Sequence, residues 1–202
     1  MKKQNNFSHP LVSTPEIYNF ENKNKLFYFD MRYINGTSFS EFISQNTIQQ
    51  IEPIVEKLFS YLFEPRESHS IDYGEKIKTK IESISKFLNS EHLIFKNYCI
   101  NYEWADTKIN YCHGDLTFEN IIIYKGGIYF IDFLDSFMEN SLIDVSKVMQ
   151  DLLIGWSWRF SDTCPFVKNQ YIYEILKNRL SIREMEVCKR LLVLNLLRIV
   201  PY

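Results

Sequence analysis

The sequence predicts an α+β fold: a mostly helical body, one β-hairpin embedded in that body, and a small second hairpin near the N-terminus. After residue 38, apolar residues recur at helical spacing over most of the chain. The runs at 16–34 and 111–133 are strand-like instead. With 202 residues, 46% of them hydrophobic and 24% charged, the chain suits one globular domain, or one domain with a small appendage.

The composition argues against several classes of protein. The formal net charge is −2 and no long basic run occurs, so a nucleic-acid partner has no electrostatic support. No apolar run reaches the roughly 20 residues of a membrane span, and polar residues follow Met1-Lys2-Lys3 where a signal peptide would be apolar. We therefore expect a cytoplasmic protein with no membrane partner. The four cysteines form no C-x-x-C pair and are expected to be free thiols.

The N-terminal part is expected to hold one hairpin. Residues 1–15 contain two prolines and are predicted to be an irregular lead-in. The runs at 16–20 and 25–34 are typical of strands, and the polar residues 21–24 between them predict a turn. Asn35-Gly36 ends the second strand.

The helices are predicted from caps and periodicity. Ser38 and Glu41 fit a capping box, with Ser38 bonding forward and Glu41 reaching back, for a short helix to about Gln45. Asp144 is the expected N-cap of the helix in "LIDVSKVMQDLLIGW". Further helices are predicted from apolar spacing over 47–63, 74–89, 166–178 and 182–199, with another near the end of 90–110.

The embedded hairpin brings polar residues together. Its strands, "IIIY" (121–124) and "IYFIDF" (128–133), flank Lys125-Gly126-Gly127, whose two glycines are expected to supply the positive φ of a tight turn. If the turn is centred on Gly126, residue 120 lies opposite residue 132. If the centre of the turn is shifted by half a residue, residue 121 lies opposite residue 132. In either register Asn120 and Asp132 meet at the open end of the hairpin.

Three oxygen-bearing side chains then surround one point, because Asp115 lies in the loop that leads into Asn120. Such donors suit Mg²⁺ when phosphates provide its other ligands. Asn120 and Asp132, fixed on strands, are candidate metal ligands, and Asp115, in a loop, can accept a proton from an incoming hydroxyl. Phosphoryl transfer requires these parts.

The segment "HGDLTFEN" followed by "IDF" resembles the catalytic segment of the aminoglycoside phosphotransferase and choline kinase family, whose members are relatives of the protein kinases. The resemblance implies a protein-kinase-like fold, with a remnant N-lobe at 1–35 and a helical C-lobe at 36–202. It places Asp115 on the catalytic aspartate and Asn120 and Asp132 on the two metal ligands. It implies Mg²⁺ as cofactor and ATP or GTP as phosphate donor.

The resemblance also implies supporting residues. His113 falls on a histidine that shapes the loop, and Asp144 falls on an aspartate that we interpret as a structural brace. Asp135 is either an acid that supports the metal ligands or an exposed side chain. Trp156 and Trp158 are interpreted as core residues or as a substrate wall, including a wall for a cationic ligand through cation–π contact.

The nucleotide site is predicted by the same resemblance. "LFYFDMRYINGTSFSEFI" is similar to the family's last N-lobe strand, hinge and first C-lobe helix. The backbone of Met31, Arg32 and Tyr33 would then face the purine base, with Ile131 on the floor of the site and Ile123 as a weaker candidate for that floor.

One departure from the family leaves two functions open. The family carries a phosphate-covering loop and a Lys–Glu pair ahead of the strand at 16–20, whereas here that region has no glycine and only Lys2 and Lys3 as lysines. The first function is a small-molecule kinase that phosphorylates a hydroxyl of a sugar, an amino alcohol or an aminoglycoside. The second is a non-catalytic or partner-dependent kinase-like domain, with a homodimer as the simplest arrangement. No P-loop motif is present, and the other histidines lack the context of a metallophosphatase.

Overall fold

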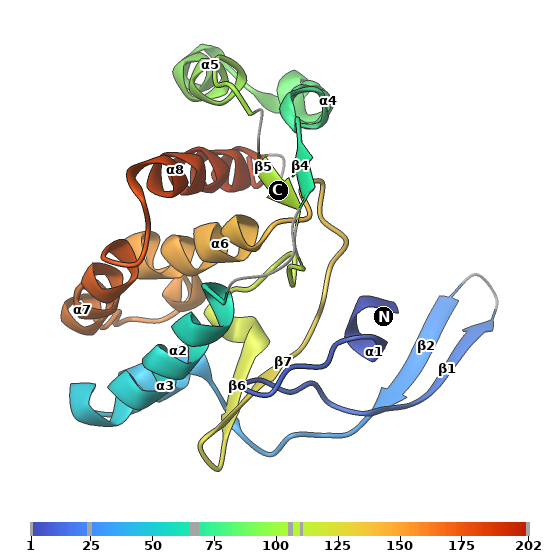
Figure 1. Ribbon diagram of the computed structural model, residues 1–202, viewed down its shortest axis with the longest axis vertical. Helices are drawn as coiled ribbons and strands as arrows, with labels where there is room; N and C mark the ends of the chain where they lie inside the picture. Colours follow the sequence, from blue (N-terminus) through green and yellow to red (C-terminus); the bar gives the residue numbers. More distant parts are fainter. Residues whose placement is uncertain (1, 24–25, 65–68, 105–106, 110, 201–202) are drawn as a thin grey trace.

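The computed structural model describes residues 2–23, 26–64, 69–104, 107–109 and 111–200. Its mixed α/β architecture confirms the predicted fold class: a helical body carries one embedded hairpin, and a second hairpin stands to one side of it (Figure 1). In the described part of the chain, no helix is long and apolar enough to cross a membrane.

The N-terminal hairpin consists of β1 (Ile17–Lys23) and β2 (Leu26–Met31), which pair antiparallel. The turn was predicted too early, because β1 continues through residues 21–23 and pairs Lys23 with Leu26. Polar residues do not end this strand, since an antiparallel pair with a face in water accepts them.

The lead-in is more ordered than predicted. It starts with the short helix α1 (Lys2–Asn5), and its later part adds to the embedded hairpin. The amide of Ser13 donates to the carbonyl of Ile128 at 2.9 Å, and the amide of Phe130 donates to the carbonyl of Ser13 at 2.8 Å. Val12 is buried in the main core. Burial of apolar side chains therefore overrides the two prolines, and this segment packs on the helical body.

The helices of the body lie close to their predicted positions. They are α2 (Phe39–Gln45), α3 (Ile48–Leu62), α6 (Ser141–Ile154), α7 (Phe166–Lys177) and α8 (Ile182–Leu197). Half of the predicted capping box forms at α2: Ser38 Oγ accepts from the amide of Glu41 at 3.2 Å, but the Glu41 carboxylate accepts from Gln45 Nε2. The core is rich in aromatic residues; its largest fully buried side chains include Tyr61, Tyr73, Phe39, Phe59, Phe118 and Phe130.

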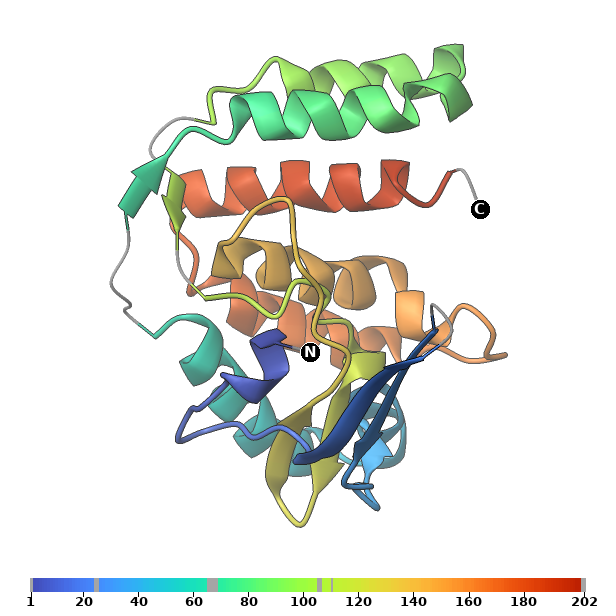
Figure 2. The ribbon, with the colours of Figure 1, turned by 90° about the vertical axis from the view of Figure 1, so that its right-hand side faces the viewer.

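A helical pair covers α8. The helices α4 (Gly74–Ile84) and α5 (Leu93–Ile100) lie side by side along α8 (Figure 2). The strands β4 (His69–Ile71) and β5 (Thr107–Ile109) pair at the base of this unit. They were not predicted, because three residues are too few to show a strand pattern. Among the described residues, four 3₁₀ turns complete the elements: η1 (Ser85–Phe87), η2 (Ser90–His92), η3 (Phe118–Asn120) and η4 (Trp156–Trp158).

The embedded hairpin corrects the predicted register. The strands β6 (Ile121–Tyr124) and β7 (Gly127–Phe130) form a sheet of order β3-β6-β7 with β3 (Thr37–Ser38). Positive φ angles occur at Lys125 (49°) and Gly126 (72°), as in a two-residue hairpin turn.

Gly127 is already the first residue of β7, so the expectation that it supplies positive φ was wrong. Ile121 pairs with Phe130. Residue 120 therefore lies opposite 131, and both predicted registers were off by one or two residues.

Candidate active site

A buried carboxylate on α6 holds the H-G-D loop. Asp144 Oδ2 accepts from the amide of His113 at 2.6 Å, and Oδ1 accepts from the amide of Gly114 at 2.8 Å. Asp144 was wrongly predicted to be the N-cap of this helix. Asn140 takes that role by accepting from the amide of Leu142 at 2.7 Å. The contacts of Asp144 are those of a brace between α6 and the loop.

Gly114 lies where two chain segments cross. Its φ is +96°, and a Cβ at this position would lie 2.2 Å from the carbonyl oxygen of Leu134. The amide of Leu134 donates to the carbonyl of His113 at 3.0 Å. Because a side chain would both clash and strain the backbone, glycine is required between His113 and Asp115.

His113 joins the loop to the segment after β7. It is fully buried, its Nδ1 accepts from the amide of Asp115 at 3.2 Å, and its Nε2 lies 2.7 Å from the carbonyl oxygen of Ile131. These partners require a neutral ring with the proton on Nε2. Burial lowers the pKa of His113 to about 4. The ring thus links the H-G-D loop to the segment after β7.

Asn120 is oriented by the loop that precedes it. It was predicted to lie on the strand, but it is the last residue of η3, directly before β6. Its Nδ2 donates to the carbonyl of Asp115 at 2.8 Å, and the amide of Thr117 donates to that same carbonyl at 2.8 Å. Because the amide nitrogen is engaged, the Oδ1 atom of Asn120 is left to face the cavity.

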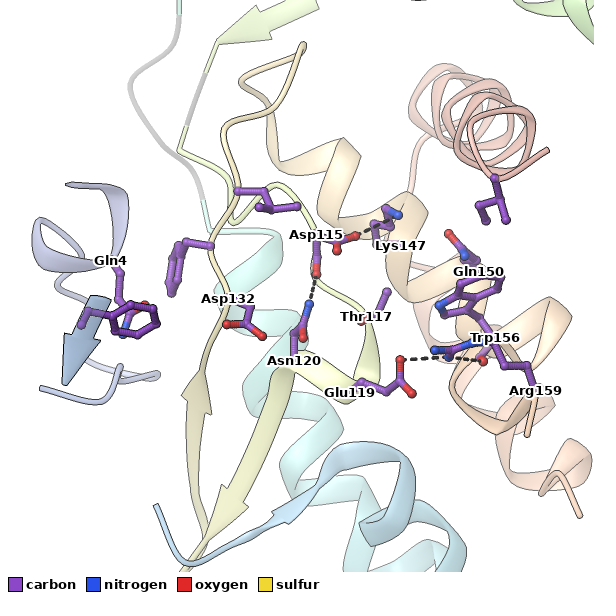
Figure 3. A pocket seen from close by; sticks show the side chains of 14 residues that line it. Gln4, Asp115, Thr117, Glu119, Asn120, Asp132, Lys147, Gln150, Trp156 and Arg159 are labelled. Carbon is purple, nitrogen blue, oxygen red and sulfur yellow. Dashed lines mark hydrogen bonds and ion pairs between the residues drawn. The ribbon is translucent and has the colours of Figure 1, made fainter. Parts of the chain in front are cut away.

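Asp132 reaches the same point through an unusual backbone. It lies beyond β7, with a φ of +58°, a left-handed conformation that is uncommon outside glycine. In the observed register, regular alternation would direct a residue at 132 away from Asn120. The left-handed backbone instead brings the two side chains together (Figure 3). No hydrogen bond or ion pair engages the Asp132 carboxylate within the described ranges.

The donor set of this pair fits a magnesium ion. Asn120 offers an amide oxygen and Asp132 a carboxylate, and both face one space (Figure 3). Mg²⁺ is usually held by one or two protein carboxylates, with waters and substrate phosphates as its other ligands.

A lysine that the sequence interpretation missed lies beside Asp115. Lys147 Nζ, from α6, is 2.8 Å from Asp115 Oδ1, and both side chains are largely shielded from water. Lys3, one of the two lysines ahead of the first strand, is engaged elsewhere: its Nζ donates to the carbonyl of Leu134 at 3.0 Å and lies 2.9 Å from Glu139 Oε2. Lys147 therefore places a positive charge directly beside the Asp115 carboxylate.

These residues line a cavity of about 720 Å³ that opens between the body and the N-terminal hairpin. Gln150 is fully buried in its wall, and neither polar atom of its side chain has a hydrogen-bond partner in the structure as described. Other residues that the sequence did not single out also line the cavity: Gln4, Phe29, Thr117, Glu119, Lys147 and Arg159.

The sequence held a signal for the missed residues on α6. Asp144, Lys147, Gln150 and Asp151 recur at helical spacing, so polar side chains form one face of an otherwise apolar helix. Three of them are buried. Asp151 Oδ2 accepts from the amide of Phe118 at 2.7 Å, and burial raises the pKa of Asp151 to about 6. A buried polar face on an apolar helix indicates contacts to a loop or ligand.

The four residues predicted to bind the nucleotide do not line this cavity: they are Met31, Arg32, Tyr33 and Ile131. The amide of Arg32 donates to the carbonyl of Glu16 at 2.8 Å, and Tyr33 is largely exposed. Both backbone polar groups of Ile131 are bonded to the neighbouring loop. Their role toward a nucleotide stays a prediction.

The two tryptophans separate into different roles. Trp158 is buried, and its Nε1 donates to Ser44 Oγ at 2.9 Å, so it is a core residue. Trp156 lines the cavity, and the guanidinium of Arg159 lies 4.5 Å from its ring centroid. Asp135 is exposed and lines a second cavity that also includes Asp115.

No family model matches the chain, and no curated protein matches its sequence. Solved structures share its fold, among them the following two. A thermostable mutant of aminoglycoside phosphotransferase APH(4)-Ia in its apo form matches with a TM-score of 0.67, at 10% identity, over 97% of this chain and 73% of that chain. A glucosamine kinase matches with a TM-score of 0.54, at 14% identity, over 93% of this chain and 60% of that chain. The predicted kinase-like fold is thereby confirmed.

Proposed function

We propose that the chain is a small-molecule kinase that uses Mg²⁺ and transfers the terminal phosphate of ATP or GTP to a hydroxyl of a small metabolite. One observation carries the proposal: Asp115, Asn120 and Asp132 line one cavity at the open end of the embedded hairpin. The fold supports it, because the solved structures that share this fold include an aminoglycoside phosphotransferase and a glucosamine kinase.

Asp115 is the proposed catalytic base. In the reaction, the acceptor oxygen forms a bond to the terminal phosphorus, the bond from that phosphorus to the bridging oxygen breaks, and the hydroxyl proton passes to the Asp115 carboxylate. The carbonyl of Asp115 accepts hydrogen bonds from the backbone amide of Thr117 and from the side-chain amide of Asn120. The carboxylate of Asp115 therefore has a defined position. Positioning of this kind, together with electrostatic stabilisation, provides most of the catalysis in phosphoryl transfer.

Asn120 and Asp132 are the residues that would hold the metal ion. Bound Mg²⁺ neutralises charge on the phosphates of the nucleotide. Asn120 presents its amide oxygen because its amide nitrogen is bonded to Asp115, and Asp132 presents a carboxylate without an ion-pair partner among the described residues. The two side chains thus offer ligands without first breaking contacts of their own.

Lys147 is proposed to contact the transferred phosphate. It lies beside the base, on a rigid helix, and largely out of water, where a fixed cation stabilises developing negative charge most strongly. Family members use a lysine of the N-lobe to grip phosphates. Lys3 is bound to Glu139 and is not available for that role. A cation from α6 would therefore supply charge that the N-terminal part does not.

The partner-dependent alternative has one observation in its favour. The N-terminal hairpin exposes several aromatic side chains, and two strands alone are marginally stable in water. More than 40% of the surface of each of these side chains is exposed: Tyr18, Phe20, Tyr28 and Phe29. Phe29 also lines the cavity. A second copy of the chain that covers this hairpin would complete the upper side of the site.

A panel of acceptors separates the two functions. Sugars, amino alcohols and aminoglycosides are incubated with the chain, Mg²⁺ and ATP or GTP carrying a labelled terminal phosphate, and products are identified by mass spectrometry. Transfer of the label to an acceptor, absent in Asp115→Asn, supports the kinase. Nucleotide binding without transfer to any acceptor supports the non-catalytic alternative.

A further inference from the structure

The side chain of Gln150 has unused hydrogen-bonding capacity in the wall of the cavity. It is fully buried, and neither its amide oxygen nor its amide nitrogen has a hydrogen-bond partner in the structure as described. By contrast, the buried amide of Asn195 donates to Ser146 Oγ at 3.0 Å. Leaving a buried amide unpaired costs about 1–3 kcal/mol. An unpaired amide in a cavity wall therefore indicates a group that a ligand satisfies.

Gln150 lies close to the proposed base. It follows Lys147 by one turn of α6, so both side chains project from the same face of the helix. Lys147 contacts Asp115 at 2.8 Å. Figure 3 shows Gln150 and Trp156 on the opposite side of Asp115 from the candidate metal ligands. Because the phosphates of the nucleotide are expected at the metal ligands, an acceptor hydroxyl would enter on the side of Gln150.

A buried carboxylate holds both sides of the cavity in position. Asp151 Oδ1 accepts from the amide of Ser157 at 2.8 Å, and Oδ2 accepts from the amide of Phe118 at 2.7 Å. The first contact fixes the turn η4, which carries Trp156, and the second fixes η3, which ends at Asn120. Both turns are thus attached to α6, the helix that carries Gln150, and this favours a preformed binding site.

The charged side chains that line the cavity are already compensated. Lys147 pairs with Asp115 at 2.8 Å, and Arg159 pairs with Glu119 at 2.9 Å. Asp132 is the remaining charged residue of the lining, and it is assigned to the metal ion. Within the part of the chain that the structure describes, this lining therefore offers no unpaired charge to an acceptor.

A neutral acceptor matches such a wall best. A glutamine amide both donates and accepts hydrogen bonds, so it can bind hydroxyl groups or another amide. A charged group would lose its hydration without gaining an opposite charge, which is costly. The guanidinium of Arg159 also lies 4.5 Å from the ring centroid of Trp156, so that face of the ring is not open to an ammonium group.

We infer that Gln150 determines acceptor specificity: its amide binds hydroxyl or amide groups of an uncharged, polyhydroxylated acceptor whose reacting hydroxyl is directed at Asp115. This inference rests on the proposed function. Among the acceptors considered above, it selects neutral sugars and related polyols over aminoglycosides and amino alcohols.

Compounds that differ mainly in charge test the inference without turnover. Glucose, N-acetylglucosamine and myo-inositol are neutral, protonated glucosamine is a cation, and glucuronate is an anion. Each is titrated into the chain by calorimetry, in the presence of Mg²⁺ and without nucleotide. We expect the tightest neutral compound to bind at least about tenfold more tightly than either charged compound, a difference of about 1.4 kcal/mol.

Variants locate the binding. Gln150→Leu should weaken binding of the preferred neutral compound by about tenfold, equivalent to about 1.4 kcal/mol. The matched control is Gln45→Leu, because Gln45 is exposed on α2, donates to Glu41 and does not line the cavity.

Four results would overturn the inference. The first is that no neutral compound binds, and the second is that glucosamine or glucuronate binds as tightly. The third is that Gln45→Leu weakens binding as much as Gln150→Leu. The fourth is that Gln150→Leu lowers stability and leaves binding unchanged, which is the result expected if a buried water satisfies the amide in place of a ligand.

The same compounds, assayed for transfer with ATP or GTP and Mg²⁺, keep the two claims apart. Transfer only to glucosamine or glucuronate would overturn the neutral acceptor and leave the proposed kinase intact. Binding of a neutral compound that depends on Gln150, without transfer to any compound, would support the neutral ligand site and count against the kinase. With transfer, Gln150→Leu should raise the KM of the neutral acceptor by about tenfold, with the KM of the nucleotide within a few-fold of the parent.

Discussion

The ammonium group of Lys147 lies 2.8 Å from a carboxylate oxygen of Asp115, and this pair forms the boundary between two cavities. One cavity contains the candidate metal ligands, and the other extends from Asp115 toward α4 and the end of α8. A hydroxyl on the side of Gln150 and a phosphate on the side of Asp132 would meet at this pair. The lysine and the aspartate come from different elements, α6 and the H-G-D loop, so their separation depends on the Asp144 brace.

Lys147→Met should slow phosphate transfer by about 10²-fold or more, because a fixed charge next to the transferred group is lost. The fold should persist, since methionine keeps an apolar stem of similar length where the Lys147 side chain is 12% exposed. The rate is measured at saturating nucleotide and acceptor. Lys147→Arg, which keeps the charge, should recover part of the rate. Equal rates for the parent and Lys147→Met would remove Lys147 from the reaction.

Asp132→Ala should abolish the benefit of Mg²⁺ for nucleotide binding, because a metal-ligating carboxylate is removed. Calorimetric titrations of ATP and GTP, with and without Mg²⁺, measure that benefit for parent and variant. Asp135→Ala is the matched control, three residues along the chain and exposed. If Mg²⁺ strengthens nucleotide binding equally in the parent and in Asp132→Ala, then Asp132 is not a metal ligand.

Gln150→Leu should leave the free energy of unfolding unchanged or raise it, because the buried amide has no hydrogen-bond partner among the described residues. Binding of nucleotide or acceptor should weaken, since the amide faces the cavity. Chemical denaturation measures the stability. The control is Asn195→Leu, which removes a buried amide that donates to Ser146 Oγ at 3.0 Å and should cost about 1–3 kcal/mol. Similar destabilisation by both variants would contradict a role for Gln150 in ligand binding.

His113 should make the folded state less stable in acid. Its pKa is about 4 when folded and 6.5 in the unfolded reference, so between these values the unfolded chain binds more protons. Stability is therefore complete above pH 6.5 and falls as the pH drops toward 4, by about 3 kcal/mol in total. Protonation of Nδ1 would also break the bond from the amide of Asp115, and transfer should fall with it.

The measurement compares the free energy of unfolding of the parent and of His113→Gln between pH 4.5 and 7. The comparison separates the effect of His113 from that of Asp151. Burial raises the pKa of Asp151 to about 6, so protonation of Asp151 stabilises the folded state as the pH falls over part of this range. The parent should lose more stability than His113→Gln as the pH falls. Identical pH dependence in both proteins would show that His113 is not held neutral by the fold.

The sequence was sufficient to predict both hairpins and most of the helices, and to predict that Asp115, Asn120 and Asp132 lie close together. Alternating apolar runs around a short polar turn predict a hairpin, and the residues at its open end were named on that basis. The predicted register was wrong because the turn has its positive φ angles at Lys125 and Gly126, whereas they were expected at Gly126 and Gly127. Asp132 still reaches Asn120, through a positive φ that no propensity argument predicts.

The contacts between elements could not be predicted in the same way. Lys147 is 32 positions from Asp115, so their meeting depends on how α6 packs against the H-G-D loop. A one-dimensional pattern marks such residues only as polar positions on an apolar helix. Asp144 shows the same limit: its position suggested a helix cap, and tertiary packing made it the brace of a distant loop.

The central claim is that Asp115 accepts the proton in phosphate transfer. The most direct test is the rate of transfer by parent and Asp115→Asn, at saturating Mg²⁺, nucleotide and acceptor, with nucleotide affinity measured alongside. The account predicts that the rate falls by about 10²–10⁴-fold while nucleotide affinity stays within a few-fold of the parent. Transfer by Asp115→Asn at the rate of the parent would contradict it.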